Sequence, residues 1–394
     1  MRENIISAAD SYRLRLTKLS QRIHDNPELG LEEDKAAEWL CAELRENGFD
    51  VEKGVAGMGT AFTAKYAVNQ AAPKIGFIAE YDALPEIGHG CGHSLIGPAA
   101  VGAALVLKKA LPDDLLNIMV FGTPAEENAG GKIPMLRAGL FQGMDAVLMF
   151  HAHNEDVAAC PMISRVSLVI EFFGKSAHAS AFPWNGINAL DAIILLFSGI
   201  NALRQQMRPE ARVHGVITEG GTAANIIPEH TRAEFYVRAR DAAYLAELTN
   251  QVRRCAEAAA IASGCKVKIE EPLPAYLSDL TPSALEQAVE MNMRTLGLNP
   301  EKAVPPLGFG SSDFGNVSQE VPAVLSYLKI APKGVATHSR AFAEASASRK
   351  AYDAMLAAVK LMALTAYDLM TQPALLRTIN EEFFKLKGGT TVGL

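Results

Sequence analysis

Three short and almost wholly apolar runs occur in the first 150 residues, at Lys74–Ala79, Leu115–Gly122 and Asp145–Phe150. Continuous apolar runs of this length are typical of strands that are buried on both faces, as in parallel sheets. Amphipathic helical patterns occupy other parts of the same region. We therefore predict an α/β domain with a largely parallel sheet, from helices at 11–25, 32–47 and 95–107 and a further strand at 60–68.

The pattern changes near Ser164, where hydrophobic and polar residues begin to alternate. The segment that follows reads strand–helix–strand–strand–helix–strand, an order that predicts a small α+β domain with a ferredoxin-like sheet. After Pro272 the earlier pattern returns, with expected helices at 282–296 and 344–371 and a strand at 322–328. We therefore expect one catalytic domain, residues 1–163 and 273–394, interrupted by an inserted domain at 164–272.

Composition and charge narrow the setting. The net charge is −7 without a concentrated basic run, which argues against nucleic acid as a partner. The five cysteines are scattered, so we expect a reducing compartment and no disulfide framework. The most apolar run, Leu95–Leu107, is too short to span a bilayer, and the N-terminus lacks a signal-length apolar segment. We predict a cytoplasmic protein without membrane association.

Potential metal ligands follow each of the three apolar strands. Cys91 and His93 follow the first, Glu126 and Glu127 the second, and a His-Ala-His sequence the third. The carboxyl ends of parallel strands share one edge of a sheet, so these side chains should meet there. Thiolate, imidazole and carboxylate together suit zinc or another first-row divalent ion. The sequence indicates a metal-dependent amidohydrolase whose candidate ligands are Cys91, His93, Glu126 or Glu127, His151 or His153, and His338.

A resemblance runs through almost the whole chain in order. The motifs that carry it are Arg22-Ile23-His24 with Pro27-Glu28-Leu29-Gly30, Glu80-Tyr81-Asp82-Ala83-Leu84-Pro85, Gly90-Cys91-Gly92-His93, Pro124-Ala125-Glu126-Glu127, Gly174-Lys175-Ser176-Ala177-His178-Ala179, Asn225-Ile226-Ile227-Pro228 and Ser312-Asp313-Phe314-Gly315-Asn316-Val317. With these motifs the chain resembles the aminoacylase/carboxypeptidase-G-type metallopeptidases, the twentieth metallopeptidase family. Within that family it is similar to the branch of auxin-conjugate amidohydrolases, p-aminobenzoyl-glutamate hydrolases and cytosolic dipeptidases.

The resemblance implies a di-metal centre. Two divalent ions, zinc in the first place and manganese or cobalt as alternatives, would be held by Cys91, His93, Glu127, His151 and His338. Glu126 would be the general base and then the acid that protonates the leaving nitrogen. Asp82 would orient His93 without touching the metal. The second imidazole of the third strand exit, His153, leaves the choice of ligand there open.

The resemblance also assigns the inserted domain a double role, as a lid over the site and as the surface of a homodimer; a higher assembly is an alternative. His178 would stabilise the oxyanion, often in the partner subunit's site, and Asn225 and Arg238 would bind the substrate's carboxylate. The implied substrate is a small N-acyl amino acid or dipeptide with a free carboxylate.

Three other functions stay open. The first is a p-aminobenzoyl-glutamate-type hydrolase. The second is a cysteine hydrolase with Cys91 as nucleophile and His93 as base, although two residues so close on one loop make a poor nucleophile–base pair. The third is a non-catalytic member that uses the lid as a binding surface, against which the complete set of candidate ligands argues.

Overall fold

The computed structural model describes residues 1–302 and 310–388, and these residues form two compact units. Unit 1 contains Met1–Pro161 together with most of the chain after Asp279. Unit 2 contains Met162–Ser278 and also Ser311. Unit 1 is therefore built from two separate stretches of the chain, with unit 2 inserted between them.

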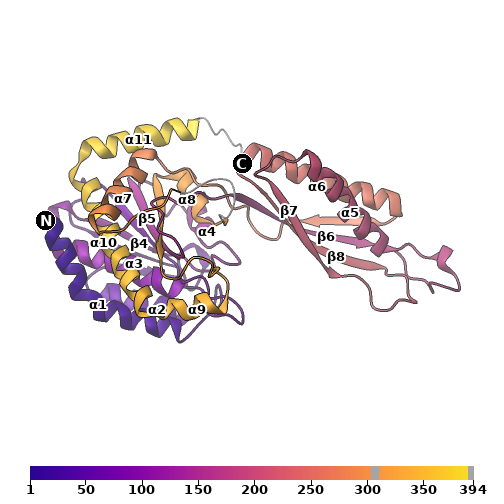
Figure 1. Ribbon diagram of the computed structural model, residues 1–394, viewed down its shortest axis with the longest axis horizontal. Coiled ribbons are helices and arrows are strands. Elements are labelled where there is room, and N and C mark those ends of the chain that lie inside the picture. Colours follow the sequence, from indigo (N-terminus) through magenta and orange to yellow (C-terminus); the bar gives the residue numbers. More distant parts are fainter. Residues whose placement is uncertain (303–309, 389–394) are drawn as a thin grey trace. The chain divides into compact units, whose positions relative to one another are not determined.

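A six-stranded mixed sheet forms the centre of unit 1, in the order β1-β2-β4-β3-β5-β10 (Figure 1). The four strands from β4 to β10 run parallel, and β1 and β2 form an antiparallel edge. The carboxyl ends of β3, β4 and β5 therefore point to the same edge. The strands are β1 (Asp50–Lys53), β2 (Phe62–Ala67), β3 (Ile75–Ala79), β4 (Asn117–Gly122), β5 (Ala146–His153) and β10 (Ala323–Lys329).

Helix α3 (His93–Ala110) forms the core of unit 1. Its first fifteen residues, His93–Leu107, are all buried, and it packs against β3 and β5 and against helices α1 and α10. Helix α10 is long and apolar enough to cross a membrane, but 72% of its most apolar window is buried inside the structure. The other helices are α1 (Arg2–His24), α2 (Asp34–Glu46), α4 (Lys132–Arg137), α7 (Ser283–Thr295), α8 (Phe314–Glu320), α9 (Arg340–Ser346), α10 (Arg349–Thr371) and α11 (Pro373–Gly388).

Several predicted boundaries differ from the structure. Strand β5 continues through His153 and does not end at Phe150, because it pairs with β10 along its whole length. The helix expected at 344–371 is divided into α9 and α10, since the Ser348 side chain accepts a hydrogen bond from Ala351 N and caps a new helix. Helix α1 begins at Arg2, earlier than expected, and α11 was not predicted.

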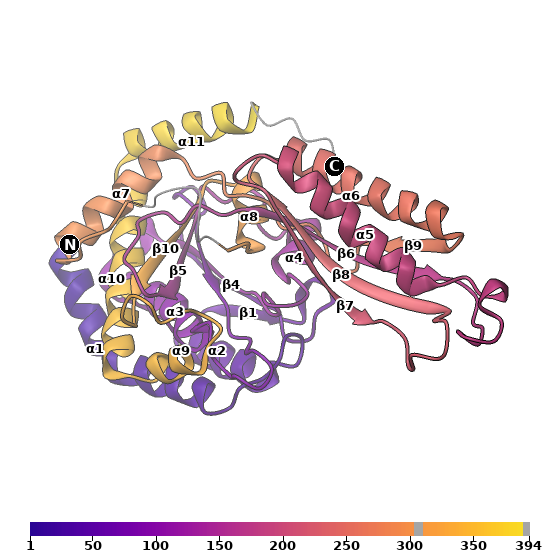
Figure 2. The same ribbon diagram turned by 45° about the vertical axis from the view of Figure 1, so that its right-hand side comes forward.

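Unit 2 has the predicted ferredoxin-like topology, an antiparallel sheet in the order β7-β8-β6-β9. Helices α5 and α6 pack together on one face of this sheet (Figure 2). Alternate residues of β6 and β8, such as Leu168, Ile170 and Phe235, point toward these helices and form the core. The elements are β6 (Ser164–Phe173), α5 (Ala189–Leu203), β7 (Arg212–Glu219), β8 (His230–Ala239), α6 (Ala242–Ser263) and β9 (Lys266–Glu270).

Candidate active site

The loop between β3 and α3 brings Cys91 and His93 to the carboxyl edge of the sheet. His93 is the first residue of α3, and the preceding Gly92 has a φ of 82°. A Cβ on Gly92 would lie 2.5 Å from Cβ of Ala152 on β5. Glycine at position 92 therefore allows both the left-handed turn and the close approach of this loop to the next strand.

A carboxylate fixes the orientation of the His93 ring. Nδ1 of His93 lies 2.8 Å from Oδ1 of Asp82, and because a carboxylate only accepts hydrogen bonds, Nδ1 carries the proton and Nε2 is left with its lone pair. Burial alone would lower the pKa of His93, but Asp82, Cys91 and Glu80 raise it well above its usual value. The surroundings of this ring therefore favour a positive charge.

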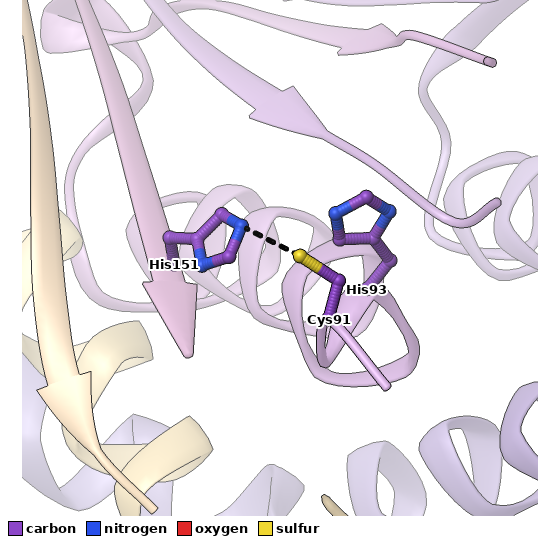
Figure 3. A group of neighbouring side chains, drawn as sticks. All are labelled: Cys91, His93 and His151. Atoms are coloured by element: carbon purple, nitrogen blue, oxygen red, sulfur yellow. Dashed lines mark hydrogen bonds between the residues drawn. The ribbon is translucent and has the colours of Figure 1, made fainter. Parts of the chain in front are cut away.

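His151 faces Cys91 from the end of β5 (Figure 3). Nδ1 of His151 donates to the carbonyl oxygen of Ala152 at 2.8 Å, so the lone pair of Nε2 points to Cys91 Sγ at 3.6 Å. Burial lowers the pKa of His151 to about 4, which keeps the ring neutral and able to bind a metal. His153 instead stacks on Tyr327, with ring centroids 4.2 Å apart.

His338 and Glu127 approach Cys91 from the other side. His338 has a φ of 62°, and its backbone N–H donates to Gly90 O at 2.8 Å, so its loop is tied to the Cys91 loop. Nε2 of His338 lies 3.4 Å from Oε1 of Glu127. Burial would raise the pKa of Glu127, but His338 and His93 lower it to about 2, so this carboxylate stays ionised.

These side chains form two overlapping groups of potential metal ligands that share the Cys91 thiol. The donor atoms of each group lie within 4.8 Å of one another. Ligand atoms lie about 2.0–2.3 Å from a zinc ion, so two ligands of one ion are roughly 3.3–3.8 Å apart. Two donor atoms at the centre, His93 Nε2 and Glu127 Oε1, are buried and have no hydrogen-bond partner among the described residues. The geometry therefore fits two metal ions, one at Cys91, His93 and His151 and the other at Cys91, Glu127 and His338.

Glu126 lies beside these groups at the exit of β4. The preceding Ala125 has a φ of 60°, and its N–H donates to the buried Glu33 carboxylate at 2.8 Å. Burial, together with the charges of Glu127 and Glu80, raises the pKa of Glu126 well above its usual value. A carboxyl group with a raised pKa beside a metal site is suited to accept a proton and then to donate it.

Sequence reasoning did not select three buried charged side chains next to this centre. Lys132 Nζ lies 2.5 Å from Glu80 Oε1 and 2.6 Å from Asp313 Oδ1, and all three side chains are fully buried. Glu80 and Asp313 belong to motifs of the family resemblance but received no role. Lys132 follows Gly131, where a Cβ would lie 2.1 Å from Pro124 O. This pair of glycines before Lys132 was the signal for a tightly packed turn.

In unit 2, His178 and Asn225 lie beyond one end of the sheet. Nδ1 of His178 accepts from the N–H groups of Ser180 and Ala181, at 3.3 and 3.2 Å, so its Nε2 carries the proton. Ala179 N donates to Asn225 O at 3.0 Å, which places the two segments side by side. His178 therefore presents a hydrogen-bond donor from a largely exposed loop.

Arg238 lies at the opposite end of the same sheet. It pairs with Arg165 at the start of β6, and its Nη1 donates to Ser311 Oγ at 3.1 Å. The eight residues from His230 to Arg238 span roughly 26 Å at about 3.3 Å per residue, and the Asn225 segment lies beyond His230. Within one chain, the structure therefore does not bring Arg238 together with His178 and Asn225.

Comparison with known proteins agrees with this architecture. Residues 164–263 match the peptidase dimerisation domain of the M20 family. The chain is 38% identical to the Xaa-Arg dipeptidase of Mus musculus over 97% of its own length and 90% of that protein. It is 27% identical to a subunit of the p-aminobenzoyl-glutamate hydrolase of Escherichia coli, over 96% and 94%.

Two solved structures share the fold. An aminobenzoyl-glutamate utilization protein from Klebsiella pneumoniae superimposes with a TM-score of 0.72, at 17% identity over 92% of this chain and 98% of that one. A dinuclear metal-binding peptidase of the M20 family from Bacillus subtilis gives a TM-score of 0.64, at 21% identity over 89% and 99%. Because the sequence match to the mouse dipeptidase extends over nearly all of both chains, this protein belongs to the M20 family of metal-dependent peptidases and amidohydrolases.

Proposed function

We propose that this protein hydrolyses the amide bond of small dipeptides or N-acyl amino acids with a free carboxylate, using two divalent metal ions. The observation that carries the proposal is the pair of ligand groups around Cys91, with the Glu126 carboxyl beside them. We expect zinc, with manganese or cobalt as alternatives, because thiolate and imidazole ligands favour such ions over magnesium or calcium.

The bound metals would lower the pKa of a water molecule and polarise the scissile carbonyl. The chain's own part in the reaction is to move protons and to position the substrate. Glu126 accepts the proton of the attacking water and delivers it to the leaving nitrogen, a role for which its raised pKa is suited. Asp82 holds the His93 ring with Nε2 toward the centre.

The second unit would supply groups that bind the substrate. His178 carries its proton on Nε2, so it can donate a hydrogen bond to the oxygen that becomes negative during attack. Asn225 and Arg238 would bind the substrate's carboxylate, the guanidinium of Arg238 by paired hydrogen bonds. These two side chains lie at opposite ends of one sheet, so we propose that a single active site takes them from two different subunits.

The edge strand β7 is the surface through which such a dimer would form. Seven of its eight residues are exposed or nearly so, and Val216 and Ile217 keep 57% and 38% of their surface in contact with solvent. An edge strand with unpaired backbone groups and exposed apolar side chains is a site for pairing with another chain. Its position inside the segment that matches a peptidase dimerisation domain supports a homodimer made through unit 2.

Mixing two inactive variants tests this shared site. A dimer of one His178→Ala chain and one Glu126→Gln chain contains one site with both wild-type residues if His178 acts in the partner's site. Random mixing should then restore about one quarter of the wild-type activity, since about half of the dimers are mixed and each has one intact site. Activity that remains at the level of the separate variants would exclude the shared site.

Dipeptides with a C-terminal arginine are the first substrates to test, because a relative of that specificity is 38% identical. The panel should also contain N-acetyl amino acids and p-aminobenzoyl-glutamate, the latter because of the 27% identical relative from Escherichia coli. Preferred cleavage of p-aminobenzoyl-glutamate would assign the chain to that second function.

Replacing the proposed base tests the mechanism. We expect Glu126→Gln to retain the wild-type metal content and to lose at least about a hundredfold in kcat, the lower end of what a general base contributes. The matched control is Glu32→Gln, which changes an exposed glutamate in a turn of the same unit and should leave kcat unchanged. Full activity of Glu126→Gln would refute the assignment.

The cysteine-hydrolase alternative makes the opposite prediction. Burial and the neighbouring Glu127 charge raise the pKa of the Cys91 thiol well above its usual value, so without a metal this thiol is a poor nucleophile. Activity that survives complete removal of metal by a chelator, but not alkylation of Cys91, would establish the cysteine mechanism in place of ours.

A further inference from the structure

The buried ammonium of Lys132 joins three segments that meet at the metal centre. Its Nζ contacts Glu80 Oε1 at the exit of β3 and Asp313 Oδ1 at the start of α8. Its backbone N–H donates to Asp313 Oδ2 at 2.9 Å, and Lys132 is itself the first residue of α4. A fully buried lysine with two buried carboxylates costs desolvation energy, so a purely structural role could be filled by apolar side chains at least as well.

The contact with Lys132 decides how the Glu80 carboxylate is turned. One oxygen, Oε1, is bound by the ammonium, while Oε2 lies 3.4 Å from His93 Nε2, the atom that faces the metal centre. Glu80 Oε2 is buried and has no hydrogen-bond partner among the residues that the structure describes. Oxygens of Glu80, Glu126 and Asp313 also lie within 4.8 Å of one another, so Lys132 is the cation beside three buried carboxylates.

We propose that Lys132 is a positioning residue for the metal centre: it holds Glu80 Oε2 toward the metal-binding face of His93 and keeps three acidic side chains together beside it. This inference rests on the proposed function, because it assigns Lys132 to the support of that same di-metal site. It goes further in making the Lys132–Glu80 contact, which the family motifs did not single out, a determinant of metal affinity and turnover.

The test separates positioning from charge balance with two variants. In Lys132→Met the Glu80 carboxylate loses its partner and the buried charge is unbalanced. In the double variant Lys132→Met/Asp313→Asn one negative charge is removed together with the positive one, and the side-chain amide oxygen introduced at position 313 can still accept from the backbone N–H of residue 132. The double variant should therefore fold, even if the single one does not, while Glu80 is unrestrained in both.

We expect the double variant to bind zinc about 10–100-fold more weakly than the wild type in competition with a chromophoric chelator, as for the loss of other side chains that support metal ligands. We expect kcat to fall by a similar factor while KM changes little, because no substrate contact is removed. The control is Asp368→Asn, which breaks the contacts of Asp368 with Arg2 and Asn292 elsewhere in unit 1 and should lower stability without changing metal affinity or kcat.

A folded double variant with wild-type zinc affinity and kcat would overturn the proposal and leave Lys132 a structural role. The zinc titration reads out metal binding whether or not the chain cleaves any substrate of the panel. A wild-type protein that binds zinc but hydrolyses no amide would therefore contradict the proposed function, while weaker zinc binding by the double variant would still uphold the role of Lys132.

Discussion

Replacing Glu33 by glutamine should remove a pH-dependent loss of stability. Glu33 is buried between Thr60, whose hydroxyl donates to Oε2 at 2.9 Å, and Ala125, whose N–H donates to Oε1 at 2.8 Å. Burial, followed by the charge of Asp82, raises the pKa of this carboxyl from 4.5 to about 7. Glutamine has nearly the same shape, can accept from Ala125 N, and does not titrate.

The sign follows from where the proton is bound. Between pH 4.5 and 7 the folded protein keeps the proton on Glu33 while the unfolded chain loses it, so unfolding becomes more favourable as the pH rises through this window. A difference of about 2.5 pKa units corresponds to about 3 kcal/mol. Below the window this contribution is absent, and above it the loss is complete.

Denaturant unfolding at a series of pH values measures this contribution. The stability of Glu33→Gln relative to the wild type should rise by about 3 kcal/mol from the acid to the alkaline side of the window, because all other groups titrate alike in both proteins. Glu32→Gln, at the exposed neighbouring position, should show no such change. A difference between Glu33→Gln and wild type that stays constant with pH would refute the reasoning.

Three further changes test the support of the metal ligands and of the substrate oxygen. Gly92→Ala should destabilise unit 1 by about 1–3 kcal/mol and lower its metal content, because φ is 82° there and a Cβ would meet Ala152; thermal unfolding and metal analysis measure this. Asp82→Asn should weaken zinc binding about 10–100-fold by releasing the His93 ring, as a chelator competition would show. His178→Ala should lower kcat by at least about tenfold at unchanged metal content, and unchanged kcat would remove His178 from the mechanism.

Much of the fold could be predicted because its signals are local. The apolar runs before residue 150 predicted β3, β4 and β5, and the alternation after Ser164 predicted the ferredoxin-like sheet. Boundaries set by pairing or capping were less accessible. Strand β5 extends to His153 because β10, nearly 200 residues later, offers partners for it, and α10 begins anew because the Ser348 side chain caps it.

The site could be predicted where ligands follow strands, and less well where charges are buried. The structure groups Cys91 and His93 with His151, while His153 stacks on Tyr327, a distinction that depends on which rotamer each ring adopts and is not visible in the sequence. The contact of Lys132 with Asp313 joins residues 181 positions apart. A lysine in a glycine-rich loop looks like a solvated side chain until the fold shows that it is buried.

Metal content combined with chelator sensitivity tests the central claim most directly. Elemental analysis of the purified chain, followed by hydrolysis of Xaa-Arg dipeptides with and without chelator, should give about two zinc, manganese or cobalt ions per chain and activity that is lost and restored with the metal. A chain that neither retains nor takes up these ions, or one that hydrolyses the dipeptides equally well without them, would contradict the account.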